Sequence, residues 1–159
     1  MLKICDTTIP GIPLSVNRMY TRLPNRRKAV LTKEGKAWKN RVQLSIQEVI
    51  PLDLLLDRHN QLLGMFIFKG SFITKKNEAR IRDLDDLLKS VVDGVFNGLN
   101  VNDCTLFDLL AFKRNSQEET TRVILYSLDS MEMEVDPYEI YGSIFKRDGY
   151  LLTKSKESG

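Results

Sequence analysis

The pattern of apolar and polar positions divides the chain into five short β-type segments separated by turns and helical repeats. Residues 2–9 and 29–31 are short and rich in β-forming residues, which predicts two strands in the first part of the chain. The apolar run 62–73 predicts a longer strand. Residues 106–114 and 120–128 predict two more strands, and the polar turn between them favours a hairpin.

Two segments show helical spacing of apolar residues. Thr32 can cap a helix over 33–50, whose apolar stripe consists of Trp38, Val42, Ile46 and Val49. The lysines and arginine of this segment (Lys36, Lys39 and Arg41) fall largely off the stripe, as expected for a solvent or ligand face. A second helix is predicted over 85–97, with Gly98 near its end. The order of elements predicts an α+β fold, in which a small mixed β-sheet packs with two main helices.

The last thirty residues differ from the rest of the chain. Apolar residues first alternate with glutamates, then three aromatic residues follow at helical spacing, and a polar tail begins near Thr153. The apolar and aromatic positions are Met131, Met133, Val135, Tyr138, Tyr141 and Phe145. We therefore expect one domain over 1–129 and a C-terminal extension over 130–159 that contains a strand or helix before the tail.

Composition indicates an ordinary soluble globular protein. The chain has 159 residues, of which 42% are hydrophobic and 28% charged, and this length is sufficient to bury a core without disulfides. Cys5 and Cys104 match no zinc spacing and do not suggest secretion. No apolar stretch reaches the roughly 18 residues that a membrane-spanning helix needs. A cytoplasmic protein without a membrane partner is the expectation.

Charge is distributed unevenly along the chain. Residues 1–50 hold ten Lys/Arg against three Asp/Glu, whereas residues 101–159 hold seven against eleven, within a net charge of +3. A basic first third suggests a polyanionic partner, and a solvated surface without a partner is the other interpretation that charge alone leaves open.

Carboxylates gather around one lysine in residues 82–103. Asp83 and Asp85 lie two apart at the predicted start of a helix, Lys89 and Asp93 follow at intervals of four residues, and Asp103 closes the run. Such a concentration of negative charge is costly unless a divalent cation or solvent screens it. Magnesium prefers oxygen ligands, and the chain has a single histidine, so this pattern favours magnesium or manganese over zinc.

Purely structural interpretations of the same residues stay open. Asp85 or Asp86 can cap the helix, and Asp103 can be an ordinary turn residue. Asp85, Lys89 and Asp93 also form an i,i+4 ladder, which contributes only about 0.2–0.5 kcal/mol per pair on an exposed helix.

Three sequence blocks in order resemble the RusA family of Holliday-junction resolvases. They are P-L-S-V-N-R-M-Y at 13–20, L-T-K-E-G-K-A-W at 31–38, and R-D-L-D-D-L-L-K at 82–89 with Asp93 and Asn102-Asp103 after it. The resemblance covers roughly residues 7–128 and is far more specific than any one block alone. It implies a RusA-like domain in residues 1–129 and says nothing about residues 130–159.

The resemblance also implies roles for single residues. Asp83, Asp85 and Asp103 would bind magnesium and act in catalysis, Lys89 would be an essential base that stabilises phosphate charge or the leaving group, and Asp93 would support them. Two positions depart from the family pattern. Asp86, a further supporting position, stands where the family usually has asparagine, and Asn102 stands where it often has aspartate. The two changes nearly cancel in charge, so we expect catalysis to survive, while metal preference can shift.

The N-terminal block and the basic segments are expected to contact DNA. The predicted contact residues are Asn17, Arg18, Tyr20, Arg22, Arg26, Arg27, Lys28, Lys75, Lys76, Arg80 and Arg82. The basic ones would bind phosphates without reading sequence. Tyr20 would wedge into the branch point, although a core tyrosine is the alternative.

These features predict a magnesium-dependent, structure-selective endonuclease that resolves Holliday junctions by paired symmetric nicks, with manganese as a substitute metal. The resemblance implies a homodimer acting on branched DNA during recombination and repair, in a bacterial or phage-infected cytoplasm. A flap- or fork-selective nuclease of the same fold and a non-catalytic binder of branched DNA are the alternatives. A third alternative makes the C-terminal extension a docking element for a partner protein.

Overall fold

A computed structural model describes residues 2–22, 29–57, 59–80 and 82–128 of the chain. Internal contacts divide the chain into two units, Met1–Asp129 and Ser130–Gly159. The strand or helix and the polar tail expected in 130–159 lie outside the described residues. Among the helices that the structure describes, none is long and apolar enough to cross a membrane.

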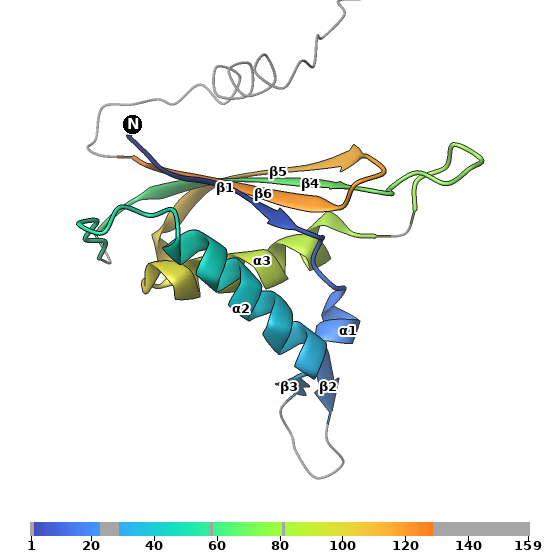
Figure 1. Cartoon of the computed structure of the whole chain (residues 1–159), viewed down its shortest axis with the longest axis horizontal. Coiled ribbons are helices and arrows are strands. Elements are labelled where there is room, and N and C mark those ends of the chain that lie inside the picture. The colour runs from blue at the N-terminus through green and yellow to red at the C-terminus, as the bar shows by residue number, and fades with distance from the viewer. Residues whose placement is uncertain (1, 23–28, 58, 81, 129–159) are drawn as a thin grey trace, which may run out of the picture. The chain divides into compact units, whose positions relative to one another are not determined.

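A four-stranded mixed sheet forms the centre of the first unit (Figure 1). Its strands are β1 (Leu2–Pro10), β6 (Thr120–Ser127), β4 (Leu62–Gly70) and β5 (Leu106–Asn115), in that order across the sheet. β6 runs antiparallel to both β1 and β4, whereas β4 and β5 are parallel. The helices lie on one face of this sheet (Figure 1), so the predicted α+β class with a mixed sheet is confirmed.

The predicted hairpin of the last two strands is wrong, because β4 lies between β5 and β6. Every residue of β4 except Lys69 is buried, so this strand takes a central position with a neighbour on each side. β5 instead leaves Phe107 and Leu109 substantially exposed and takes the edge. β4 also ends at Gly70, earlier than the predicted limit at residue 73.

Two main helices pack against the sheet. α2 (Lys33–Gln47) starts as predicted at Thr32, whose hydroxyl oxygen accepts a hydrogen bond of 3.0 Å from the backbone N–H of Gly35. It ends three residues before the predicted limit. α3 (Leu84–Leu99) is slightly longer than predicted and ends where Asn100 adopts a left-handed conformation with φ of 56°.

Residues 11–22, which lie between the first two predicted strands, contain two short elements. α1 (Val16–Met19) is one turn of helix, and β2 (Tyr20–Arg22) pairs antiparallel with β3 (Ala29–Leu31) in a separate two-stranded sheet. β3 confirms the short strand predicted at 29–31. Elements of three or four residues show too few positions for a hydrophobic period, which is why α1 and β2 were missed.

Glycines on α3 allow α2 to approach it closely. A Cβ atom on Gly94 would lie 2.8 Å from Cβ of Val42, and one on Gly98 would lie 3.0 Å from Cβ of Ile46. These two glycines are four residues apart and therefore lie on the same helix face. The crossing fixes the position of α3, which carries the acidic residues singled out in the sequence.

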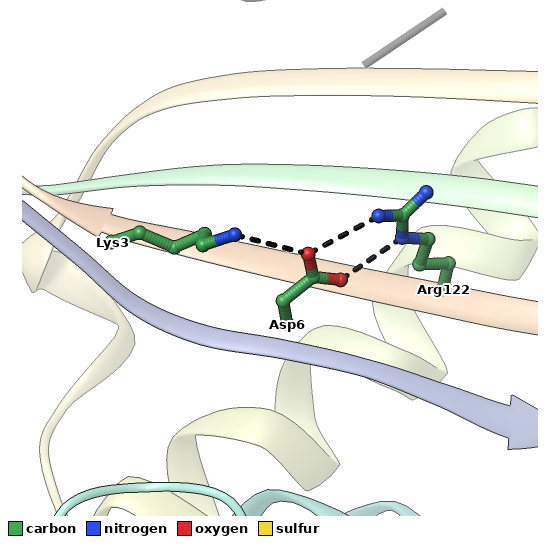
Figure 2. Close-up of polar contacts among 3 residues, drawn as sticks. All are labelled: Lys3, Asp6 and Arg122. Atoms are coloured by element: carbon green, nitrogen blue, oxygen red, sulfur yellow. Dashed lines mark hydrogen bonds and ion pairs between the residues drawn. The ribbon is translucent and has the colours of Figure 1, made fainter. Parts of the chain in front are cut away.

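The opposite face of the sheet carries a small ionic cluster (Figure 2). Asp6 accepts hydrogen bonds from Nε and Nη2 of Arg122 at 2.9 and 3.1 Å and from Nζ of Lys3 at 3.4 Å. Partial burial of Asp6 acts to raise its pKa, but Arg122 and Lys3 outweigh that effect and hold the pKa below its ordinary value. This cluster joins β1 to β6 away from the helices.

Replacing Gly94 with alanine tests the close crossing of the helices. Alanine is normally favoured over glycine within a helix by about 1 kcal/mol. Here the added methyl would overlap Val42, so Gly94→Ala is expected to lower the free energy of unfolding by about 1–3 kcal/mol in a urea titration. Asn40→Ala at an exposed position of α2 serves as the control and should change the free energy of unfolding by less than about 0.5 kcal/mol. A more stable Gly94→Ala protein would contradict the tight contact.

Candidate functional site

The N-terminal end of α3 presents two of the predicted metal ligands to solvent. Asp83 is the residue that precedes the helix, and its side chain makes no capping hydrogen bond. Asp83 and Asp85 are exposed, and Lys89 is exposed one turn further along. Asp86 is half-buried. The carboxylate of Asp83 is therefore not used by the helix as a cap, contrary to what its position alone would suggest.

Arg82 anchors this end of the helix to the sheet. Its Nη2 donates to the backbone oxygen of Pro13 at 3.1 Å, and its Nη1 lies 3.9 Å from Oε1 of Glu119. Nζ of Lys113 in β5 donates to the backbone oxygen of Arg82 at 2.8 Å. The predicted DNA-contacting Arg82 thus already binds protein groups and orders the loop that leads to Asp83.

The C-terminal end of α3 leads into a turn that carries Asp103. The 3₁₀ helix η1 (Asp103–Thr105) starts after Asn102, whose side-chain oxygen accepts a hydrogen bond of 2.9 Å from the N–H of Cys104. Oγ1 of Thr105 donates to the backbone oxygen of Asn102 at 2.9 Å. Asn102 therefore caps this turn, a role that aspartate fills equally well, and Asp103 is left exposed.

The length of α3 separates the predicted metal ligands within one chain. Asp83 precedes this sixteen-residue helix and Asp103 follows it, and a helix of that length extends about 24 Å. Magnesium ligands must lie about 2 Å from the ion. Within the described ranges, no three His, Cys, Asp or Glu side chains are grouped to hold a metal. A single copy therefore does not bring Asp83, Asp85 and Asp103 together.

Asp93 and Asp103 instead share a depression of about 200 Å³. Its lining residues are Lys39, Asp93, Phe96, Asn97, Val101, Asn102 and Asp103. Oδ2 of Asp93 lies 2.8 Å from Nζ of Lys39 on α2. Asp93 therefore forms an ion pair with the neighbouring helix instead of the i,i+4 pair with Lys89 that the sequence spacing allowed. Burial acts to lower the pKa of Lys39, but Asp93 and Tyr20 outweigh it and raise that pKa.

The predicted DNA-contacting residues occupy several places. Arg18 pairs with Glu34 at 3.4 Å, and Tyr20 is half-buried and packs against the core cluster. Arg82 is half-buried. The remaining described residues of this set are exposed: Asn17, Arg22, Lys75, Lys76 and Arg80. Arg26, Arg27 and Lys28 lie outside the described residues.

Lys39 is the residue of this region that the sequence did not single out as a site residue. Its position off the apolar stripe of α2 indicated only that it lies on a solvent or ligand face, and not which residue it contacts. Its partner Asp93 lies 54 positions away in the sequence, so no local spacing connects the two. Only the helix crossing places them together.

The α+β fold and a helix with exposed carboxylates beyond both ends define a candidate phosphodiester-hydrolysing domain. The model of the family described as endodeoxyribonuclease RusA matches residues 10–126, and the chain belongs to that family. No curated protein compared with the chain matches it. Family membership supports nuclease activity, and the family acts on branched DNA junctions.

The cap at Asn102 is expected to matter for stability independently of any catalytic role. Asn102→Ala removes the acceptor for the N–H of Cys104 and should lower the free energy of unfolding by about 0.5–2 kcal/mol in a denaturant titration. Asn102→Asp keeps the acceptor, so its free energy of unfolding should stay within about 0.5 kcal/mol of that of the parent. Equal losses in both variants would contradict the capping role.

Proposed function

We propose that this protein is a magnesium-dependent, structure-selective endonuclease that resolves Holliday junctions by paired symmetric nicks during DNA recombination and repair. The observation that carries the proposal is the family match over residues 10–126, which includes the whole acidic signature. Within that span the chain retains Asp83, Asp85, Lys89 and Asp103 in order.

The donor set fits a hard divalent cation. Asp83, Asp85 and Asp103 would hold it, because all three are exposed carboxylates and that of Asp83 is not taken by helix capping. When bound by these residues, magnesium, or manganese in its place, would neutralise phosphate charge and lower the pKa of the attacking water. Lys89, one turn after Asp85, supplies a cation that stabilises the charge developing on the phosphate or leaving oxygen. In-line attack then leaves a 5′-phosphate and a 3′-hydroxyl.

The site requires a second copy of the chain. Since α3 separates Asp83 and Asp85 from Asp103, we infer that the first two of one protomer meet Asp103 of its partner in a homodimer. A two-fold dimer built in this way has two equivalent sites, because each helix contributes one end to each site. Two sites related by two-fold symmetry suit the symmetric nicking of opposed strands in a four-way junction.

Basic residues that precede α3 in the sequence would supply affinity for DNA. Lys75, Lys76 and Arg80 are exposed in the segment just before Asp83. Such side chains contact phosphates, so binding is expected to weaken steeply as salt concentration rises. This contribution positions the duplex arms and leaves the choice of cleavage site to other contacts.

Nicking of a synthetic four-way junction tests the activity. We expect the parent protein to cut this substrate only with magnesium or manganese, and faster than labelled flaps, forks or linear duplex. Asp83→Asn should lower the cleavage rate by at least about a hundredfold, because a metal ligand is lost, while junction binding persists. Faster cutting of flaps or forks would indicate the flap nuclease, and metal-independent binding without any cleavage would indicate the non-catalytic binder.

Mixing two inactive variants tests the shared site. Asp83→Asn and Asp103→Asn should each be inactive alone. In a mixed dimer, one site combines both substitutions and the other combines neither, so the mixture should regain single-strand nicking. If each site lay within one protomer, both sites of the mixed dimer would carry a substitution and no activity would return.

The matched control for that experiment mixes Asp83→Asn with Asp85→Asn. Both substitutions lie at the same end of α3, so in the mixed dimer each site keeps one defect. This mixture should stay inactive after the same incubation. Recovery in the control, or none in the Asp83→Asn and Asp103→Asn mixture after subunit exchange has been verified, would contradict the composite site.

A further inference from the structure

An ion pair joins the two main helices beside the turn that carries Asp103. Nζ of Lys39 on α2 lies 2.8 Å from Oδ2 of Asp93 on α3. The side chains of Lys39 and Asp93 are only 17% and 32% exposed. Lys39 is therefore held by a partner on the other helix, and its position is better fixed than that of an ordinary surface lysine.

The ammonium group of Lys39 is not fully used by its ion pair. A lysine ammonium has three N–H donors, and Asp93 engages one of them. Lys39 lines the depression that also contains Asp103, so a remaining donor is available to an anion beside that carboxylate.

Charge in the depression explains why a cation is needed there. Asp93 and Asp103 alone would carry two negative charges and repel a phosphodiester. Lys39 offsets one of them at a distance of 2.8 Å. Burial disfavours the charged lysine, but Asp93 and Tyr20 outweigh burial and raise its pKa, so Lys39 remains a cation under all conditions in which the enzyme would work.

We propose that Lys39 binds the DNA backbone at the Asp103 side of the nuclease site, with Asp93 as the residue that positions its ammonium group. This inference rests on the proposed function and adds a phosphate-binding group from α2 to the residues of the signature. A purely structural ion pair is the competing explanation. A partly buried pair contributes little net stability once its desolvation is counted, so stability alone is a weak reason for the arrangement.

The salt dependence of junction binding separates the two explanations. Binding of a synthetic four-way junction is measured without divalent metal over a series of salt concentrations. Loss of one phosphate contact reduces the slope of log K against log salt by about 0.9. Lys39→Met should show this reduction, whereas Lys39→Arg and Asp93→Asn should keep the slope of the parent. With magnesium, Lys39→Met should also cleave at least about tenfold more slowly than the parent.

Lys3→Met is the matched control. Lys3 also pairs with an aspartate, Asp6, at 3.4 Å, but it lies on the sheet face away from the helices (Figure 2). Its loss should leave both the salt slope and the cleavage rate unchanged. The comparison separates a lost phosphate contact from the general effect of removing one positive charge and one ion pair.

A double variant keeps the test decisive if Lys39→Met alone folds poorly. Lys39→Met with Asp93→Asn removes both charges and leaves no unpaired carboxylate at that position. We expect it to regain the thermal stability of the parent while the salt slope stays reduced. If any folded variant that lacks Lys39 keeps the salt slope of the parent, the inference is overturned. Failure of the parent to nick the junction would instead contradict the proposed function, because the binding measurement does not depend on cleavage.

Discussion

The close crossing of α2 and α3 determines where the acidic candidate residues and Lys39 lie relative to one another. Gly94 and Gly98 remove the side chains that would otherwise separate the helices, and Val42 and Ile46 fill the space that they leave. The same crossing brings Lys39 within hydrogen-bonding distance of Asp93. Because α3 carries the acidic signature along its whole length, an altered crossing would shift both ends of the candidate site relative to the sheet.

Both ends of α3 are also held by specific hydrogen bonds. Arg82 ties the loop before the helix to Pro13 in the segment after β1, Lys113 ties it to β5, and Asn102 caps the turn after the helix. These contacts use backbone groups, which do not depend on a bound ligand. The exposed carboxylates therefore extend from an ordered framework, as the proposed metal and phosphate site would require.

The proposed composite site relates the length of α3 to the symmetry of the proposed substrate. One helix of sixteen residues is too long for its two ends to serve the same metal ion. In the proposed dimer, a two-fold axis would bring opposite ends of the two α3 helices together and generate two sites at once. Under this proposal, assembly, metal binding and cleavage would depend on one another, and a protomer alone would be inactive.

The sequence by itself determined the fold class, the major strands and helices, and the family. The hydrophobic periods of α2, α3 and β4 are long enough to be recognised without tertiary information, and the three ordered blocks match a family whose model covers residues 10–126. Local rules also identified Thr32 as a helix cap, because that interaction involves residues only three apart.

Tertiary structure alone decided strand order, the pairing of Lys39 with Asp93, and the separation of Asp83 from Asp103. Strand order depends on which strand can be covered on both sides, so sequence neighbours such as β5 and β6 need not pair. The pairing of Lys39 with Asp93 joins residues 54 positions apart through a helix crossing. The separation of Asp83 from Asp103 follows from the rigid rise of a continuous helix, which turns a compact run of acidic residues in the sequence into two distant groups in space.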